Sequence, residues 1–331
     1  MNAPIINLLI IFAAAFLSGL FLTFLLRRAA FKYGVFSRGD VAVVGGIALA
    51  AAFFLVGSYG LFIMKIFSKE IFGLFFSSLL MLTFGAIDDW KELSVGLKFT
   101  AQIICAFVLI SFGVKTQIVY LGNVVNSIIT VIWVLAITNA FNHLDIMDGV
   151  TAFTAAIIGA AFLLVAFLSH DLKVMVVSVA MIGSVLGFLA YNLPPARVYM
   201  GNAGSHFLGF LLSGLALTLS YAPMDKKMAL VTPILILGFP IYDTLFLILM
   251  RLKKKKIPFK KSNDHLVLRC LAMGYSKKKA LGFAIFWNLF FVFAAIITYR
   301  SANWQAAIAV AVVFLTALLL AKNMSRVSIN D

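Results

Sequence analysis

Two carboxamides and two carboxylates recur at every third position of a short polar stretch, as Asn139, Asn142, Asp145 and Asp148 before Gly149. Long apolar segments lie on both sides, in a chain with only 12 acidic residues among 331. Oxygen ligands of this kind suit Mg²⁺, which keeps several waters and binds carboxylates and substrate phosphates. An ordinary helix junction with Asp148 as N-cap would explain Asp148 and Gly149, but not the other three residues. The stretch therefore predicts a polar site.

A second acidic group, Asp88 and Asp89, ends another apolar segment, and Lys98 follows at the start of the next one. Adjacent carboxylates repel each other, which disfavours two charged groups unless a cation lies nearby. A divalent metal or the lysine would supply that positive charge. The other interpretation is a plain helix end with Asp–Lys pairs at the membrane interface, and the sequence leaves both open.

A third polar group follows a chain break at Asn192-Leu193-Pro194-Pro195. The run from Met200 to His206 is rich in small residues and opens the next apolar segment. Small residues at a helix N-terminus present backbone N–H groups to an anion, although Gly and Ser also begin many helices. We interpret His206, like His143, as a structural residue.

A fourth group lies near the C-terminal end, where Asp243 interrupts an apolar segment and Asp264-His265 and Arg269 follow. An aspartate within hydrocarbon is costly and is functional by default; the alternative is a structural partner for an inward lysine. The Lys253–Lys256 run is interpreted as an anchor for anionic lipid headgroups, with diphosphate steering as the less favoured reading.

The composition indicates which kind of scaffold carries these polar groups, because the chain is 63% hydrophobic and 12% charged. This indicates an all-α polytopic membrane protein, since the segments are continuously apolar and do not alternate as barrel strands do. The net charge of +15 is assigned to loops and lipid contacts, and nucleic acid is excluded as a partner. Cys105 and Cys270 imply no disulfide framework. The eleven predicted spans are 5–26, 43–64, 71–87, 97–113, 124–142, 151–169, 172–190, 204–221, 229–250, 280–299 and 303–321.

The distribution of Lys and Arg predicts that the N-terminus lies outside and the C-terminus lies in the cytoplasm. The first span fits a membrane helix better than a cleaved signal peptide. We expect one integral-membrane transferase domain over 1–331, whose cytoplasmic loops 88–96, 143–150, 191–203 and 251–279 form the active site. Most acidic residues fall on that side.

Taken together, these residues resemble the polyprenyl-phosphate N-acetylhexosamine-1-phosphate transferases. This is the family of the peptidoglycan translocase and of the enterobacterial-antigen and teichoic-acid initiating enzymes. The resemblance covers residues 34–282, with the motifs in the family's order. They are Gly85-Ala86-Ile87-Asp88-Asp89 with Lys98, Asn139-x-x-Asn142-x-x-Asp145-x-x-Asp148-Gly149, Asn192-x-x-Pro195-Ala196, Met200-Gly201-Asn202-x-Gly204-Ser205, Asp243-Thr244, His265 and Gly274-Tyr275-Ser276.

The resemblance implies that an N-acetylhexosamine-1-phosphate passes from a UDP-sugar to a polyprenyl phosphate such as undecaprenyl phosphate. UMP is released and a cell-surface glycan is started. Mg²⁺ is the implied cofactor, with Mn²⁺ as an alternative; the implied location is the inner (plasma) membrane, and a homodimer is compatible with the resemblance. The implied catalytic residues are Asp88, Asp89, Asp145 and His265, and the implied metal ligands are Asn142 and Asn202. The implied substrate-binding residues are Lys98, Asn139, Asp148, Asn192, Gly204, Ser205, Asp243 and Arg269.

Several positions depart from the family's pattern. Asn202 stands where the family has aspartate, which keeps an oxygen ligand but removes a charge, so we expect weaker Mg²⁺ binding. Val267 and Leu268 replace two histidines after His265, and Ile146 replaces the usual glycine. Two alternatives therefore stay open: a catalytically silent scaffold in glycan assembly, and a transporter of lipid-linked substrates.

Overall fold

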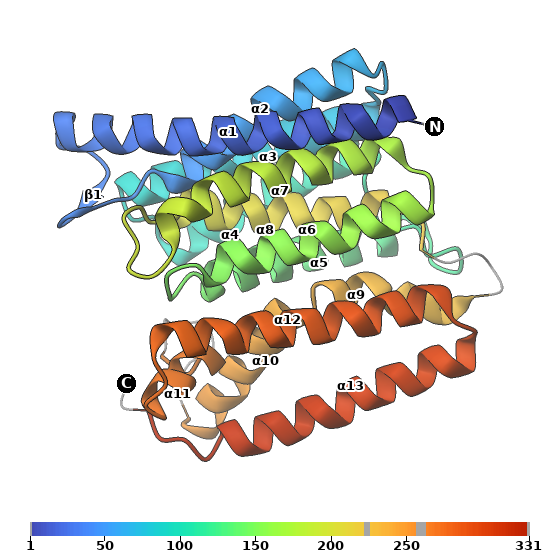
Figure 1. Ribbon diagram of the computed structural model, residues 1–331. Coiled ribbons are helices and arrows are strands. Elements are labelled where there is room, and N and C mark those ends of the chain that lie inside the picture. Colours follow the sequence, from blue (N-terminus) through green and yellow to red (C-terminus); the bar gives the residue numbers. More distant parts are fainter. Residues whose placement is uncertain (1, 222–225, 256–262, 330–331) are drawn as a thin grey trace. The chain divides into compact units, whose positions relative to one another are not determined.

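The computed structural model describes residues 2–221, 226–255 and 263–329, and the chain divides into two compact units, 1–219 and 220–331. The units are described separately, and the prediction of one transferase domain stays a prediction. Unit 1 contains α1 (Asn2–Tyr33), β1 (Ser37–Arg38), β2 (Val41–Ala42), α2 (Gly45–Ile63), α3 (Lys69–Trp90), α4 (Val95–Ser111), α5 (Asn123–Leu144), α6 (Val150–Leu168), α7 (Leu172–Asn192) and α8 (Gly201–Thr218) (Figure 1). Unit 2 contains η1 (Lys227–Val231), α9 (Thr232–Ile236), α10 (Gly238–Lys253), α11 (Leu266–Ala272), α12 (Lys277–Arg300) and α13 (Asn303–Met324).

The predicted all-α architecture is confirmed, with one additional two-stranded hairpin, β1–β2, that was not predicted from the sequence. Of the described helices, eight are long and apolar enough to cross a membrane. These are the helices α1, α2, α3, α5, α6, α7, α12 and α13. The remaining predicted spans coincide with α4, which has 17 residues, with α8, and with a broken helix in unit 2. The count of eleven spans stays a prediction.

The predicted single span over 229–250 is wrong as a continuous helix. Residues Lys227–Ile236 and Gly238–Lys253 meet at a bend of 73°. Pro240 explains the break, because proline has no N–H to donate to the preceding turn and its ring clashes with that turn's carbonyl. At the third position of α10 the proline is tolerated, since the first N–H groups of a helix have no internal partner.

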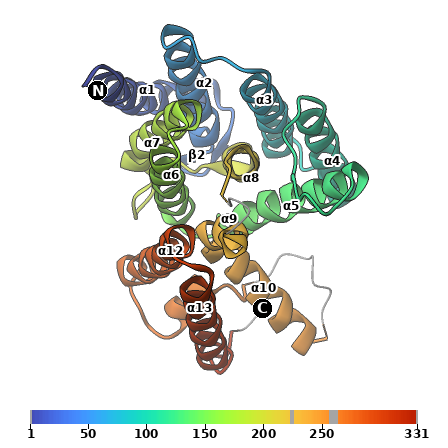
Figure 2. The same cartoon turned by 90° about the vertical axis from the view of Figure 1, so that its right-hand side faces the viewer.

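Helix α8 is the centre of unit 1. It packs against α2, α3, α5 and α6, and the view along the bundle shows these helices around it (Figure 2). All residues from Ala203 to Ala216 are buried. Side chains on α8 are therefore surrounded by helices that come from several parts of the sequence.

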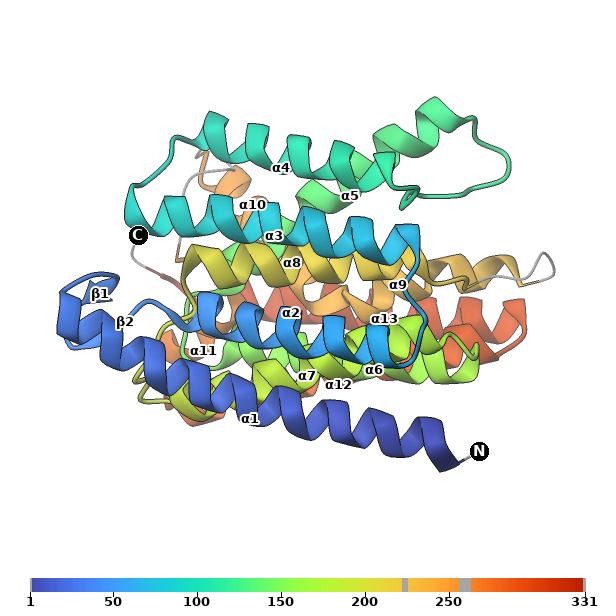
Figure 3. The same cartoon turned by 90° about the horizontal axis from the view of Figure 1, so that it is seen from above.

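Helix α1 lies along α7 and α2, as the view from above shows (Figure 3). The contact with α7 depends on small residues four apart, Gly183 and Gly187. A Cβ atom on Gly187 would lie 2.4 Å from the carbonyl oxygen of Phe16, and one on Gly183 would lie 2.7 Å from that of Phe12. Such small residues let two membrane helices bring their backbones together.

Candidate active site

The N-terminal end of α8 is fixed against the start of α2. Tyr199 donates its backbone N–H to the carbonyl of Ala42 (2.8 Å), and Gly46 donates to the carbonyl of Met200 (2.9 Å). A Cβ atom on Gly46 would lie only 2.1 Å from the backbone nitrogen of Gly204. The two backbones are therefore in direct contact, and this contact fixes the position of the turn that carries the Met200–Ser205 motif.

The same turn is capped by Asp89 at the end of α3. Its Oδ1 accepts the backbone N–H of Asn202 and its Oδ2 accepts that of Ala203, both at 2.8 Å. Gly201 has a φ of +73°, and a Cβ atom there would lie 2.5 Å from Oδ2 of Asp89. The sequence predicts a helix N-terminus that offers its N–H groups to an anion. For Asn202 and Ala203 this anion is the Asp89 carboxylate of the chain itself.

The neighbouring carboxylate, Asp88, has different partners. Its Oδ2 lies 2.8 Å from Nζ of Lys98, and its Oδ1 accepts the backbone N–H of Leu93 (2.8 Å). Asp88 is 4% exposed. The Asp–Lys pair foreseen as the plain interpretation is thus present, and Asp88 and Asp89 are each balanced by a separate positive partner: an ammonium and a helix N-terminus.

The two residues predicted as metal ligands contact each other across α5 and α8. Nδ2 of Asn142 donates to Oδ1 of Asn202 (2.9 Å) and to Oγ of Ser205 (3.1 Å). Asn139 contacts a different helix, since it exchanges two side-chain hydrogen bonds with Gln102 of α4, at 2.7 and 3.3 Å. Gln102 was not predicted as a site residue, and its signal in the sequence is a lone carboxamide within an apolar segment.

The turn between α5 and α6 holds both carboxylates of the polar stretch. Oδ1 of Asp145 accepts a hydrogen bond from the hydroxyl of Thr151 (3.1 Å), and Oδ2 of Asp148 accepts the N–H of Ala196 (3.3 Å). The N-cap of α6 is Gly149, at a φ of +82°. The interpretation of Asp148 as N-cap is therefore wrong; Asp148 reaches the loop after α7 instead.

Asn192 connects the same two regions. Its Oδ1 accepts the N–H of Gly149 (3.0 Å), and its Nδ2 donates to the carbonyl of Val198 (2.9 Å). The residue is 5% exposed. Contacts of this kind link the predicted loops 88–96, 143–150 and 191–203 within unit 1.

The donor set at Asn142, Asn202 and Ser205 is neutral oxygen, which suits a hard cation such as Mg²⁺. A cation there would compete with the Asn142 amide for Oδ1 of Asn202. Among the residues that the structure describes, no group of three or more His, Cys, Asp or Glu is placed to hold a metal. The fit to Mg²⁺ therefore depends on charge from the phosphates of a bound substrate.

The predicted loop 251–279 belongs to unit 2, and its residues 256–262, which include Lys256 and Pro258, lie outside the described residues. Asp243 is buried, and its Oδ2 lies 2.7 Å from Nδ1 of His265. Its Oδ1 accepts the N–H of Leu266 (2.9 Å), at the start of α11. The alternative in which Asp243 pairs with a lysine is therefore wrong. A carboxylate on Nδ1 favours the tautomer in which Nδ1 carries the proton.

Asp264 and Arg269 form a second buried group in unit 2. Both carboxylate oxygens of Asp264 accept hydrogen bonds from Nζ of Lys254 (3.0 Å), and Oδ1 also binds Nη2 of Arg269. Nη1 of Arg269 donates to the carbonyls of Met324 and Val327 at the end of α13. Arg269 therefore ties α11 to α13, and Lys254, which was predicted to contact lipid, forms an ion pair.

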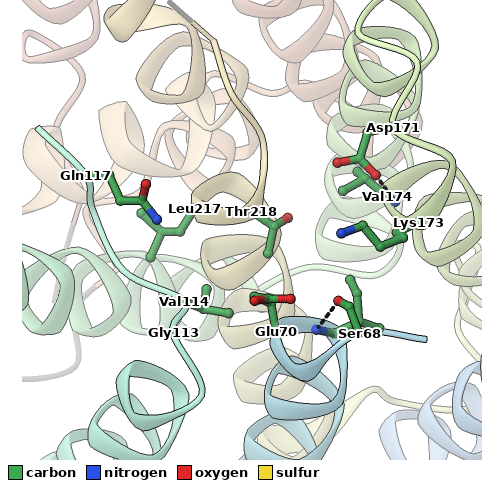
Figure 4. A pocket seen from close by; sticks show the side chains of 11 residues that line it. Ser68, Glu70, Gly113, Val114, Gln117, Asp171, Lys173, Val174, Leu217 and Thr218 are labelled. Carbon is green, nitrogen blue, oxygen red and sulfur yellow. Dashed lines mark hydrogen bonds between the residues drawn. The ribbon is translucent and has the colours of Figure 1, made fainter. Parts of the chain in front are cut away.

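A small polar cavity of about 100 Å³ lies at the other end of unit 1 (Figure 4). The starts of α3 and α7 and the end of α8 enclose it, and its polar lining includes Glu70, Asp171, Lys173 and Thr218. None of the predicted site residues lines it.

Residues 71–220 match the sequence model of Glycosyl transferase family 4. The chain is 29% identical over 324 residues to the "Probable undecaprenyl-phosphate N-acetylglucosaminyl 1-phosphate transferase" of Bacillus subtilis (strain 168), covering 92% of this chain and 88% of the relative. It is 30% identical over 249 residues to the "Undecaprenyl-phosphate alpha-N-acetylglucosaminyl 1-phosphate transferase" of Thermotoga maritima, covering 74% and 76%. It is also 29% identical over 270 residues to the "Decaprenyl-phosphate N-acetylglucosaminephosphotransferase" of Mycolicibacterium smegmatis, covering 73% and 66%.

Proposed function

The chain belongs to glycosyl transferase family 4 as a multi-pass membrane phosphoglycosyl transferase, and from this premise we propose that it transfers N-acetylglucosamine-1-phosphate from a UDP-sugar to undecaprenyl phosphate. The names of relatives from separate organisms agree on the sugar and on a polyprenyl-phosphate acceptor. The observation that carries the proposal is the meeting of Asn142, Asn202 and Ser205, beside the α3 end that holds Asp88 and Asp89.

In the proposed reaction, an oxygen of the lipid phosphate attacks the phosphorus that bears the sugar. A new P–O bond forms, the P–O bond to the uridine-bearing phosphate breaks, and UMP leaves with the bridging oxygen. Phosphoryl transfer needs positioned groups and positive charge around the spreading negative charge of the transition state. Lys98, paired with Asp88 at the α3–α4 junction, supplies an ammonium on this side of unit 1.

Asn142 and Asn202 would hold Mg²⁺ together with phosphate oxygens of the donor. The ion would neutralise diphosphate charge when bound. The chain's own part is to present two carboxamide oxygens at a fixed spacing, because α5 and α8 pack against each other and α8 is capped by Asp89.

We place this site on the cytoplasmic face of the plasma membrane, with the N-terminus outside. Two arguments support the orientation. Lys and Arg are concentrated in the loops on the same side as the polar groups, and a charged nucleotide sugar must reach the site from water. The spanning helices supply the apolar surface that a polyprenyl chain requires.

The test is an assay of the purified full-length protein in detergent with UDP-N-acetylglucosamine, undecaprenyl phosphate and Mg²⁺. We expect release of UMP and a lipid product heavier by one N-acetylglucosamine-1-phosphate. Asp88→Asn should abolish release, whereas Asp171→Asn, the same substitution at the far end of unit 1, should leave it intact.

Two outcomes would contradict the proposal. If no UDP-sugar gives UMP but Asn202→Asp does, the natural chain is a silent relative. If vesicles containing the protein move lipid-linked sugar without UMP release, and Asp88→Asn does not stop that movement, the chain is a transporter.

A further inference from the structure

The adjacent carboxylates Asp88 and Asp89 are not equivalent in the structure. Asp89 directs both oxygens at the backbone of α8, 113 and 114 residues later in the chain. Both contacts are short, at 2.8 Å, and an ionised acceptor makes such hydrogen bonds stronger than neutral ones. Asp88 instead pairs with a side chain, Lys98.

The surroundings of the α8 turn point to the same role for Asp89. Gly201 has a φ of +73° and leaves no room for a Cβ beside Oδ2 of Asp89. Two further glycines make close backbone contacts with the same turn. A Cβ on Gly85 of α3 would lie 2.7 Å from Cα of Ala203, and one on Gly46 of α2 would lie 2.1 Å from the nitrogen of Gly204. Glycines thus allow α2 and α3 to press the first turn of α8 into place, and Asp89 satisfies the N–H groups that this turn would otherwise leave unpaired.

We propose that Asp89 is a positioning residue, which fixes the first turn of α8 and thereby sets Oδ1 of Asn202 against Asn142. It does not exchange a proton with the lipid phosphate and does not attack phosphorus. The effect on catalysis rests on the proposed function, but the effect on α8 does not.

The first experiment measures hydrogen–deuterium exchange of the intact protein in detergent, resolved to the backbone amides of Asn202 and Ala203. Asp89→Asn keeps the shape of the side chain but loses one accepting oxygen. We expect exchange at these amides to become about 10- to 100-fold faster, because hydrogen bonds to charged groups are the stronger class. The matched control is Asp171→Asn, the same loss of charge at a residue whose Oδ1 accepts the Val174 N–H (3.1 Å) at the start of α7. It should leave Asn202 and Ala203 unchanged. Equal exchange in wild type and Asp89→Asn overturns the proposal.

The second experiment is kinetic. If Asp89 acts through Asn202, adding Asp89→Asn to Asn202→Ala should cost little beyond Asn202→Ala alone, because coupled residues are not additive. Gly201→Ala, which crowds the same turn, should mimic Asp89→Asn, and the pH profile of the remaining transfer should keep the wild-type shape. If the loss of activity in the double variant equals the product of the losses in the two single variants, and the pH profile changes, Asp89 instead has a chemical role. If the wild type transfers nothing, the proposed function fails while the exchange measurement still decides the role of Asp89.

Discussion

The side-chain amide of Asn142 on α5 donates to the side-chain oxygen of Asn202 on α8 at 2.9 Å, although 60 residues separate them in the sequence. Two neutral carboxamides thus meet where the family pattern has a carboxylate on α8. The pair brings oxygen ligands together without bringing charge.

The first prediction concerns that missing charge. Asn202→Asp should lower the Mg²⁺ concentration for half-maximal binding by about 10-fold or more, because a carboxylate is a better Mg²⁺ ligand than an amide. Calorimetric titration of the purified protein with Mg²⁺ in the presence of UDP measures it. Asn139→Asp is the matched control, since Asn139 contacts Gln102 and not Asn202. A gain of equal size in both variants would contradict the prediction.

The second prediction concerns the ion pair at the α3–α4 junction. Lys98→Met leaves the Asp88 carboxylate buried without its ammonium, so the protein should lose about 1–3 kcal/mol of stability. Thermal unfolding in detergent reports the loss. Adding Asp88→Asn should recover much of it, because a neutral amide needs no cation. Lys91→Met, at an exposed lysine of the loop between α3 and α4, should change little.

The third prediction concerns the packing of α1 on α7. Gly187→Ala places a Cβ 2.4 Å from the carbonyl oxygen of Phe16, so the helices must separate, at a cost on the order of 1–3 kcal/mol. Gly282→Ala in α12 is the control, because a Cβ there meets nothing within 4 Å. If both variants unfold at the same temperature as wild type, α1 does not pack as described.

The fourth prediction uses Cys270 as a probe of unit 2. Burial raises the pKa of its thiol to about 11, and only the thiolate reacts with iodoacetamide. In a Cys105→Ala background, alkylation should be very slow at pH 8 and should rise about 10-fold per pH unit toward pH 11, since the charged form appears only as pH approaches the raised pKa.

Arg269→Ala should speed this alkylation at pH 8, because the contacts of Arg269 with Asp264 and with the carbonyl of Met324 hold α11 in place. Mass spectrometry of the labelled protein gives the rate. Arg326→Ala, an exposed arginine near the same end of α13, is the control. Fast labelling of the unchanged protein at pH 8 would mean that Cys270 is accessible.

The sequence was a good guide to the helices and a partial guide to the site. Apolar length predicted the long helices, but it did not predict the short helix α11 (Leu266–Ala272), which lies in the predicted loop 251–279. It also did not predict the 73° bend near Leu237, where the composition stays apolar and only the backbone chemistry of Pro240 interrupts the helix. Gln102 was overlooked for a related reason: one carboxamide hardly changes the hydropathy of a segment. The alternative of Asp148 as an N-cap stayed open in the sequence, because a cap on the following helix and a contact with the distant Ala196 cannot be told apart from local spacing.

The sequence by itself determined that this chain folds as membrane helices and that its few buried charges must be paired. Backbone groups in lipid have to bond within their own segment, and charge in an apolar setting is too costly to leave alone. The tertiary structure alone decided the partners. Asp88 takes Lys98, Asp89 takes the start of α8, and Asp243 takes His265. These choices depend on which helices pack together, and the packing is set by glycine contacts and side-chain shape between segments far apart in the chain.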